Sequence, residues 1–553
     1  MCSDQLKEQD FYATCTIPIY QVGVSVRTTL SYLAALSSYL KIDEHHVQES
    51  NDNTELHCAA FHGNLEVVQA LLDKGASVEA RNNNGDTALH IAAQEGHLEI
   101  VRALLNKGAS VEKRNSEGCT ALHCATENGC LAVVKYFINE KRININQKND
   151  DNETPLHIAA EDGHLEVVQF LLEKGASVEE PGSEGCAALH YAAREGHLGI
   201  VQALLDKDAN IEAQNNNGDT ALHLASEMGH LGVVQYFIDE KGIDINQEND
   251  DNETPLHIAA REDRLEVVQF LLDKGASFKE RNNENCTALH YAAFGGHLEV
   301  VRVLLDKMDN ADILKKSFKC VLHIPAREGY LEIVQALLDK GADVEAKNND
   351  GDTALNEAAG CGHLEVVQFL LEKGASFETR NNEGCTALHI AAETGHLEVV
   401  QALLDKGVNV EAKSKSGSTA LHEAARMGHL GIVRHLVEKK KATIDVKDVD
   451  HSTPLDFAVF RGHKNIVEYL NFQEKKHSET SKAIKASFSI GIITMLTVAI
   501  GCIVTHVSLS ILVIAALIVG AIAGGMTYTV LKPSTKLNEY EVEGQSLLEP
   551  VTP

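Results

Sequence analysis

Tryptophan is absent from the sequence, and aromatic residues make up only 5% of its 553 residues. The core must therefore be built from leucine, valine, isoleucine and alanine. Positive charge is also scarce, because 49 lysines and arginines stand against 80 aspartates and glutamates, which gives a net charge of −31. An acidic surface repels phosphate backbones, so we expect no nucleic-acid partner, and such a surface is also a poor docking face for anionic lipid.

The cysteines form neither a metal-binding pattern nor a disulfide framework. The twelve cysteines are scattered singly, without a Cys-x-x-C pair. Five of them lie near equivalent points of a repeat: Cys119, Cys186, Cys286, Cys320 and Cys385. We interpret these as reduced thiols, which predicts that the folded part faces a cytosol. The N-terminus has no basic start followed by an apolar run, so a cleavable signal peptide is not expected.

Motifs of catalysis are missing as well. The sequence has no glycine-rich phosphate loop, no His-Glu-x-x-His and no nucleophile elbow. The acidic residues fall on predicted turns and solvent faces, where they solvate the chain. We therefore expect a protein that is not an enzyme and that holds no cofactor and no metal.

A string of the form Thr-x-Leu-His, or a near variant, recurs thirteen times at spacings of 33 or 34 residues. A period of this length indicates a solenoid of stacked units. The first positions of the strings are Thr54, Thr87, Thr120, Thr154, Ala187, Thr220, Thr254, Thr287, Cys320, Thr353, Thr386, Thr419 and Thr453.

One unit predicts two helices and a hairpin. Thr87 can cap a first helix with its hydroxyl, Gly96 ends that helix, and Gly108 can end a second helix in the left-handed conformation. Asn84-Gly85 predicts a tight hairpin turn. A single unit cannot bury its apolar face, but a stack of thirteen can. That face consists of Leu89, Ala92, Ala93, Leu98, Val101, Leu104 and Leu105.

The repeat resembles the ankyrin repeat over residues 51–470. The resemblance implies an all-α fold, a solenoid of about thirteen helix-turn-helix-hairpin units. It also implies that the motif histidine, present in eleven of the thirteen units, bonds to neighbouring backbone and to the capping threonine. The alternative interpretation of these histidines, an array of metal ligands, has no recurring carboxylate pattern to support it.

The resemblance implies protein binding through the hairpin tips and the concave face of the first helices. Arginine and aromatic side chains are the usual anchors of such interfaces, and they occupy several positions that vary between units. Acidic hairpin tips predict a basic segment in the partner. The candidate protein-binding residues are Arg81, Asp86, Arg114, Tyr191, Arg194, Tyr291, Phe294, Arg327 and Arg426.

Two regions break the pattern. In residues 308–330 the lead-in 308–316 lacks the usual C-cap glycine and Asn-Gly turn, and Pro325 falls inside the expected first helix, which predicts a weak joint. Sequence drift in a long array and a hinge between 51–307 and 331–470 are both compatible with this. Within residues 1–50, the leucines of 28–41 predict a helix that caps the first unit, or a free recognition helix.

The C-terminal composition differs from that of the repeats. We divide it into a polar basic linker (471–486), two transmembrane helices (487–531) and a polar tail (532–553), because 486–531 carries no acidic residue, lysine or arginine. Lysines flank both ends, which predicts a two-span membrane protein with its repeats and both termini in the cytosol. Gly520 and Gly524 have the spacing of transmembrane helix contacts. A buried soluble hairpin is the alternative.

These features predict a membrane-anchored ankyrin scaffold for protein–protein interaction, with the bilayer contacted through residues 487–531. Repeats combined with membrane spans resemble ankyrin proteins of obligate intracellular bacteria, which implies a host-directed effector as one role. The alternatives are an ankyrin-bearing channel, which would need a homo-oligomer formed through the hairpin, and a hairpin that shapes the membrane.

Overall fold

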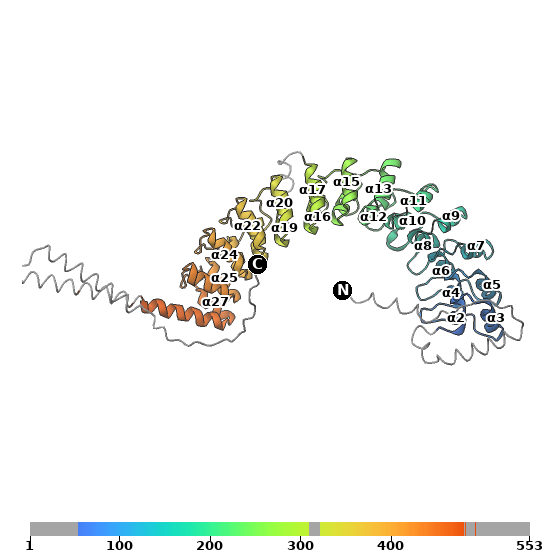
Figure 1. The fold of residues 1–553 in the computed structure, drawn as a ribbon, viewed down its shortest axis with the longest axis horizontal. Helices are drawn as coiled ribbons and strands as arrows, with labels where there is room; N and C mark the ends of the chain where they lie inside the picture. The colour runs from blue at the N-terminus through green and yellow to red at the C-terminus, as the bar shows by residue number, and fades with distance from the viewer. Residues whose placement is uncertain (1–52, 309–320, 481, 483–492, 494–553) are drawn as a thin grey trace, which may run out of the picture. The chain divides into compact units, whose positions relative to one another are not determined.

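The computed structural model describes residues 53–308, 321–480, 482 and 493 (Figure 1). The chain divides into two compact units, Met1–Lys307 and Met308–Pro553. We call their described residues the N-terminal part (53–307) and the C-terminal part (321–480). The N-terminal prediction of a capping helix falls on residues outside the described ones.

The N-terminal part consists of eight helix pairs, in which a first helix is followed by an antiparallel second helix. In chain order the pairs are α2 (Glu55–Phe61) and α3 (Leu65–Asp73), α4 (Ala88–Gln94) and α5 (Leu98–Asn106), α6 (Ala121–Glu127) and α7 (Leu131–Asn139), α8 (Pro155–Glu161) and α9 (Leu165–Glu173), α10 (Ala188–Arg194) and α11 (Leu198–Leu205), α12 (Ala221–Met228) and α13 (Leu231–Gln235), α14 (Pro255–Arg261) and α15 (Leu265–Asp273), α16 (Ala288–Gly295) and α17 (Leu298–Asp306).

The C-terminal part continues the pattern, and no strand occurs in the described residues of either part. In the last unit the first helix is α27 (Pro454–Arg461). It is followed by a helix over residues 464–480, which includes ten residues of the predicted linker. The other pairs are α19 (His323–Glu328) and α20 (Leu331–Asp339), α21 (Ala354–Cys361) and α22 (Leu364–Glu372), α23 (Ala387–Thr394) and α24 (Leu397–Asp405), α25 (Ala420–Met427) and α26 (Leu430–Arg434).

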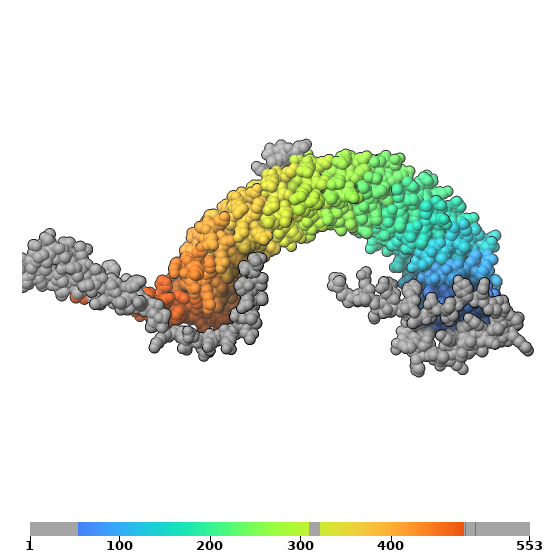
Figure 2. All heavy atoms as spheres, viewed as in Figure 1, coloured from blue at the N-terminus to red at the C-terminus, as the bar shows by residue number. Residues whose placement is uncertain are grey.

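Successive units pack through two rows of helices, one of first helices and one of second helices. In each part the first helices contact one another in chain order, as the second helices do, and Figure 2 shows the units packed directly against their neighbours. The first helices interlock through alanines such as Ala192 and Ala193, and the second helices through Val201 and Leu204, all 0% exposed. Small residues in the first helices permit this close approach, and aliphatic residues fill the space between the rows.

In most units the motif histidine caps the first helix. The backbone N–H of Thr154 donates to Nδ1 of His157 at 3.0 Å, and the Thr154 hydroxyl lies 2.8 Å from the same nitrogen. Nδ1 accepts, so Nε2 carries the proton and donates to the carbonyl of Glu180 in the next hairpin, at 2.8 Å. The resemblance-based prediction is confirmed: the histidine caps its own helix and also joins two units.

The glycine after most first helices lies against a side chain of the next unit. Gly163 has a φ of +79°, and a Cβ placed there would lie 2.7 Å from Cε1 of His197. The Nε2 atom of His197 lies 2.9 Å from the carbonyl of Glu161, so this ring also fastens one unit to another. Gly175, after the second helix of the same unit, has a φ of +84° but open space around it.

We expect Gly163→Ala to lower the free energy of unfolding by about 2 kcal/mol, because alanine strains the backbone and displaces His197. The matched variant Gly175→Ala has the same strain without the contact and should cost about 1 kcal/mol. Urea unfolding followed by circular dichroism measures both. Equal losses in the two variants would show that the contact with His197 contributes nothing.

The one-residue insertions that lengthen three of the repeats have a structural explanation in two of them. The second helices α13 and α26 each continue as a π-helical turn, η2 (Tyr236–Glu240) and η3 (His435–Lys439). A π turn accommodates one extra residue without ending the helix. Residues 136–179 are nearly repeated at 236–278, and the copied Phe137 and Phe237 are both 0% exposed. The copied phenylalanine is therefore buried as fully as the original one, although the turn around it differs.

Pro325 lies in the first turn of α19, because this helix begins at His323. A proline in a first turn lacks an N–H that would have no partner in the helix anyway, so its cost is smaller than in a helix interior. The unit adapts by starting its helix later than its neighbours do. Residues 309–320, which make up much of the predicted weak joint, lie outside the described residues.

The predicted membrane localisation needs correction. None of the described helices is both long and apolar enough to cross a membrane. The α-helices of the repeats have five to nine residues, far fewer than the roughly 20 needed, and the helix over 464–480 contains Glu474, Lys475 and Lys476. The prediction of a two-span membrane protein is therefore not upheld. Apart from Ile493, residues 487–531, on which the hairpin prediction and its channel, oligomer and membrane-shaping alternatives fall, lie outside the described residues, as do Gly520 and Gly524.

Candidate functional site

The first helices present the same few positions to solvent. Counted from the capping residue, the fifth and sixth residues are buried in every described unit except the last, whose sixth residue, Val459, is 59% exposed. The seventh residue is partly or fully exposed in all of them, and its identity changes from unit to unit: Phe61, Gln94, Glu127, Glu161, Arg194, Glu227, Arg261, Phe294, Arg327, Gly360, Glu393, Arg426 and Phe460. Packing fixes the fifth and sixth residues and leaves the seventh free to vary.

Tyr191 and Arg194, both predicted as binding residues, come together on α10. The Tyr191 hydroxyl donates to Oε1 of Glu153 at 3.0 Å, and the Arg194 guanidinium lies 5.1 Å from the centre of the tyrosine ring. Arg194 also binds Glu161 on α8 at 2.7 Å. Burial and the neighbouring Glu153 charge raise the pKa of Tyr191 well above its usual value. Because Tyr191 is only 3% exposed, it supports the surface from beneath while Arg194 reaches solvent.

Tyr291 has a related environment, but its arginine comes from another helix. Its hydroxyl donates to Glu253, and the guanidinium of Arg261 lies 5.7 Å from its ring. Arg261 binds the same Glu253 carboxylate at 2.7 Å. The sequence analysis missed Glu253 and Arg261. The separation of 38 residues that relates both Glu153 to Tyr191 and Glu253 to Tyr291 is the signal that could have found them.

Of the three candidate residues in the hairpins, one is exposed and two bind neighbouring hairpin residues. Arg81 is exposed. Asp86 accepts a hydrogen bond from Nδ2 of Asn115 in the next hairpin at 3.0 Å. Arg114 donates to the carbonyl of Gly118 at 2.9 Å and lies 3.6 Å from Oδ1 of Asp150. Asp86 and Arg114 therefore hold successive hairpins together, which leaves Arg81 as the more accessible of the three.

The two candidate arginines of the C-terminal part form ion pairs. Arg327 is paired with Glu328 at 3.2 Å, and its side chain is 44% exposed. Arg426 binds Glu423 at 2.8 Å and Glu393 on the preceding first helix at 2.6 Å, and it is 26% exposed. The exposed Arg327–Glu328 pair contributes little to stability, so Arg327 is available at the surface. Arg426 is instead half-buried and held between two glutamates.

Large apolar side chains are exposed at the ends of several first helices. In the N-terminal part Phe61, Met228 and Phe294 are 54%, 42% and 55% exposed, and in the C-terminal part Met427 and Phe460 are 44% and 81% exposed. Of these, only Phe294 was predicted from sequence. Single exposed apolar residues are ordinary. Here they recur at the seventh and eighth positions, the positions that packing leaves free.

Carboxylates near the ends of first helices in the N-terminal part have raised pKa values. Burial and then the charge of Asp162 raise the pKa of Glu127 above its usual value. Burial also raises the pKa of Asp162 and of Glu227, and nearby carboxylates add to both shifts. A positive group brought to this row would relieve the repulsion, so the row favours a cationic partner.

The arrangement matches a known family of interaction modules. A model of three ankyrin repeats matches residues 28–115, 109–182, 177–249, 241–317, 322–414 and 409–480, which is well over half of the chain. A comparison with curated proteins finds no match. Ankyrin repeats are typically non-enzymatic and bind protein partners, in keeping with the stacked helices and exposed variable positions described above. The chain belongs to the ankyrin-repeat family.

Proposed function

We propose that the chain is a scaffold whose row of first helices holds a segment of a partner protein that is both basic and apolar. The observation that supports this proposal concerns the seventh position of the first helices. The side chain there changes from unit to unit, while the packing beneath it stays the same. Phe61, Met228 and Phe294 supply apolar contacts, and the crowded carboxylates supply negative charge. An interface needs both, since apolar anchors provide affinity and charge provides orientation and rate.

The partner segment would lie along the row of first helices in the N-terminal part. Its basic side chains would face Glu127, Asp162 and Glu227, whose carboxylates must be ionised to attract it. Because burial raises their pKa values, we expect affinity to fall as the pH is lowered toward those values. The candidate residues Arg81 and Arg194 would contact acidic positions of the same partner.

Selection of random 12-residue peptides against the full chain tests this proposal. We expect selected peptides to be rich in lysine, arginine and large apolar residues. Their affinity should fall about tenfold for E127Q/D162N/E227Q, because three attractive charges are lost. The control E99Q/E166Q/E266Q removes the same charge from exposed positions of the second helices and should leave affinity unchanged. Equal effects of both triple variants would contradict the placement on the first helices.

A further inference from the structure

Three first helices carry an aromatic residue at the same place, the fourth position after the cap. Tyr191, Tyr291 and Phe457 each meet the motif histidine of the preceding unit edge to face, with ring centres 5.5, 6.3 and 5.9 Å apart. The three sites therefore share one aromatic contact. They can be compared by the side chains that bind the aromatic ring at each site.

At the first two sites, side chains of the chain itself bind the tyrosine. Each tyrosine hydroxyl donates to a glutamate, Glu153 or Glu253, at the residue before a capping position. Each ring also carries an arginine of the chain over its face, at 5.1 and 5.7 Å. A carboxylate and a guanidinium thus enclose the aromatic ring.

At the third site both partners of the ring have changed. Phe457 has no hydroxyl, and Ser418 stands where Glu153 and Glu253 stand at the other sites. Arg426 occupies the position of Arg261, but without a glutamate at 418 it binds Glu423 and Glu393. Among the described residues, no lysine or arginine lies over the Phe457 ring.

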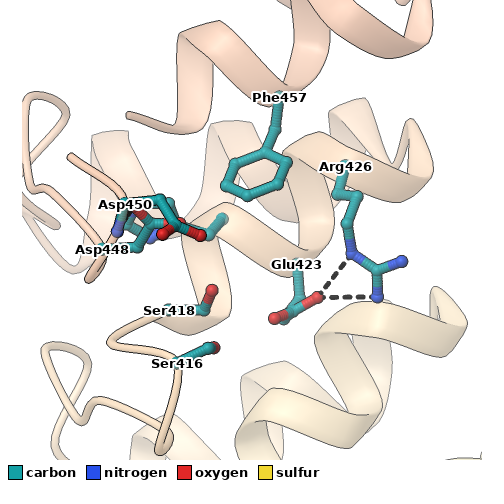
Figure 3. A pocket seen from close by; sticks show the side chains of 8 residues that line it. Ser416, Ser418, Glu423, Arg426, Asp448, Asp450 and Phe457 are labelled. Atoms are coloured by element: carbon teal, nitrogen blue, oxygen red, sulfur yellow. Dashed lines mark hydrogen bonds and ion pairs between the residues drawn. The ribbon is translucent and has the colours of Figure 1, made fainter. Parts of the chain in front are cut away.

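The vacated space is a half-open hollow of about 250 Å³ (Figure 3). It is lined by Ser416, Ser418, His422, Glu423, Arg426, Asp448, Asp450 and Phe457. Ser418 is only 4% exposed, it points into this space, and its hydroxyl has no hydrogen-bond partner among the described residues. The hydroxyl therefore faces the hollow and can accept a hydrogen bond from an added donor.

The polar lining of the hollow consists mainly of acceptors. Asp448 is 8% exposed, and its Oδ1 accepts the backbone N–H groups of Asp450 and Ser452 at 3.0 and 2.7 Å. This leaves Oδ2 without a hydrogen bond in the part of the chain that the structure describes. At the equivalent place of other hairpins an asparagine, such as Asn249, presents its NH₂ group to the preceding hairpin, where it binds Asp219 at 2.7 Å. Asp448 replaces that donor with an acceptor.

Charge in the hollow is negative. The carboxylates of Glu423, Asp448 and Asp450 line it, and the one lining arginine, Arg426, shares its charge with Glu393 outside it. An aromatic face beside several acceptors fits a planar cation with several N–H donors. A guanidinium meets this description better than an ammonium, because it can stack on a ring and donate in its own plane.

We propose that this hollow receives an arginine side chain of the partner protein, in the place that the chain's own arginine takes at the other two aromatic sites. The guanidinium would stack on Phe457 and donate to Asp448 Oδ2, to Glu423 and to the Ser418 hydroxyl. This proposal rests on the proposed scaffold function for the origin of the arginine, but the hollow can be tested without a partner.

The test is fluorine NMR of the full chain carrying 4-fluorophenylalanine at position 457, titrated with N-acetyl-arginine amide. We expect a saturable shift of the resonance and at most a fifth of that shift with N-acetyl-citrulline amide, which has the same shape without the charge. A label at position 460, where the side chain is 81% exposed and lies outside the lining, should not respond. Equal responses to arginine and citrulline would overturn the proposal.

Two variants test the geometry. D448N installs the asparagine that other hairpins carry, keeps Oδ1 as the turn acceptor, and should weaken arginine binding at least fivefold. S418E restores the glutamate of the other sites, so Arg426 should return to the ring and abolish the shift. Unchanged arginine binding in both variants would disprove the site. Failure of the peptide selection with a normal arginine response would instead count against the scaffold function alone.

Discussion

Lowering the pH from 7 to 5 is expected to destabilise the N-terminal part by about 2 kcal/mol for each of His123, His157 and His290, or about 6 kcal/mol together. Burial lowers the pKa of each of these rings from the usual 6.5 to about 4. Their total is comparable with the whole stability of many domains. Acid should therefore unfold the repeats well above the pH at which carboxylates are protonated in unfolded chains.

The direction follows from which state binds protons more tightly. An unfolded chain protonates these histidines near pH 6.5, whereas the folded chain does so only near pH 4. The stabilisation is therefore complete above pH 6.5 and is lost as the pH falls toward 4. Glu127 and Glu227 act in the opposite direction, because their folded pKa values are raised, so their strain is relieved as they protonate. The carboxylates oppose the histidines between about pH 4.3, where they titrate in an unfolded chain, and their raised folded pKa values.

Hydrogen exchange of the full chain at a series of pH values measures this effect unit by unit. We expect protection of α6, α8 and α16 to fall first as the pH drops below 6.5. Circular dichroism at the same pH values reports the overall loss of helix. Constant protection from pH 7 to pH 4.5 would show that the buried rings are not what makes the array acid-sensitive.

His157→Asn is expected to cost about 3 kcal/mol. The asparagine would lose the bond to the Glu180 carbonyl in the next hairpin and leave a small cavity where the ring was. The chain already contains this replacement, because Asn356 occupies the histidine position of its unit. There Asn356 donates to its own Asp352 at 2.9 Å and no longer reaches the following hairpin. The unit of Asn356 therefore has one fastening fewer than its neighbours.

The reverse variant, Asn356→His, provides the matched control. It should restore a bond to the next hairpin and raise stability by about 1 kcal/mol, since it also gives up the bond to Asp352. Hydrogen exchange should show weaker protection of α8 and α10 in His157→Asn and stronger protection of α21 and α23 in Asn356→His. Opposite signs in the two variants support the histidine as an inter-unit fastener. A loss in both would indicate that each side chain is merely fitted to its own surroundings.

Periodicity was sufficient to predict the helix pairs, because their apolar and glycine positions follow from packing within one unit. The sequence analysis assigned the helix cap to the hydroxyl of Thr87. In the structure Thr87 and His90 form a capping box, in which the backbone N–H of Thr87 also donates to Nδ1 of His90 at 3.1 Å. Spacing predicted the threonine half of this cap, whereas the histidine half was expected only from the resemblance to the ankyrin repeat.

The candidate surface was harder to predict, because it depends on side chains from different units. Tyr191 and Arg194 were found, but Tyr191 is buried by Glu153, which lies 38 residues earlier in the chain. Arg261 and Glu253 were missed for the same reason. The hollow at Ser418 could not be predicted from any motif. It arises because Ser418 and Phe457 differ from the glutamate and tyrosine at the equivalent positions of the other two sites.

The near-identity of residues 136–179 and 236–278 means that the length of the array can change by exchange between two similar segments. Recombination between the two copies would remove or add a block of about 100 residues. At the new junction, a helix bearing Phe137 would be joined to the segment that follows Phe237, a phenylalanine that is equally buried. The length of the binding array, counted in whole units, can thus change in a single genetic step.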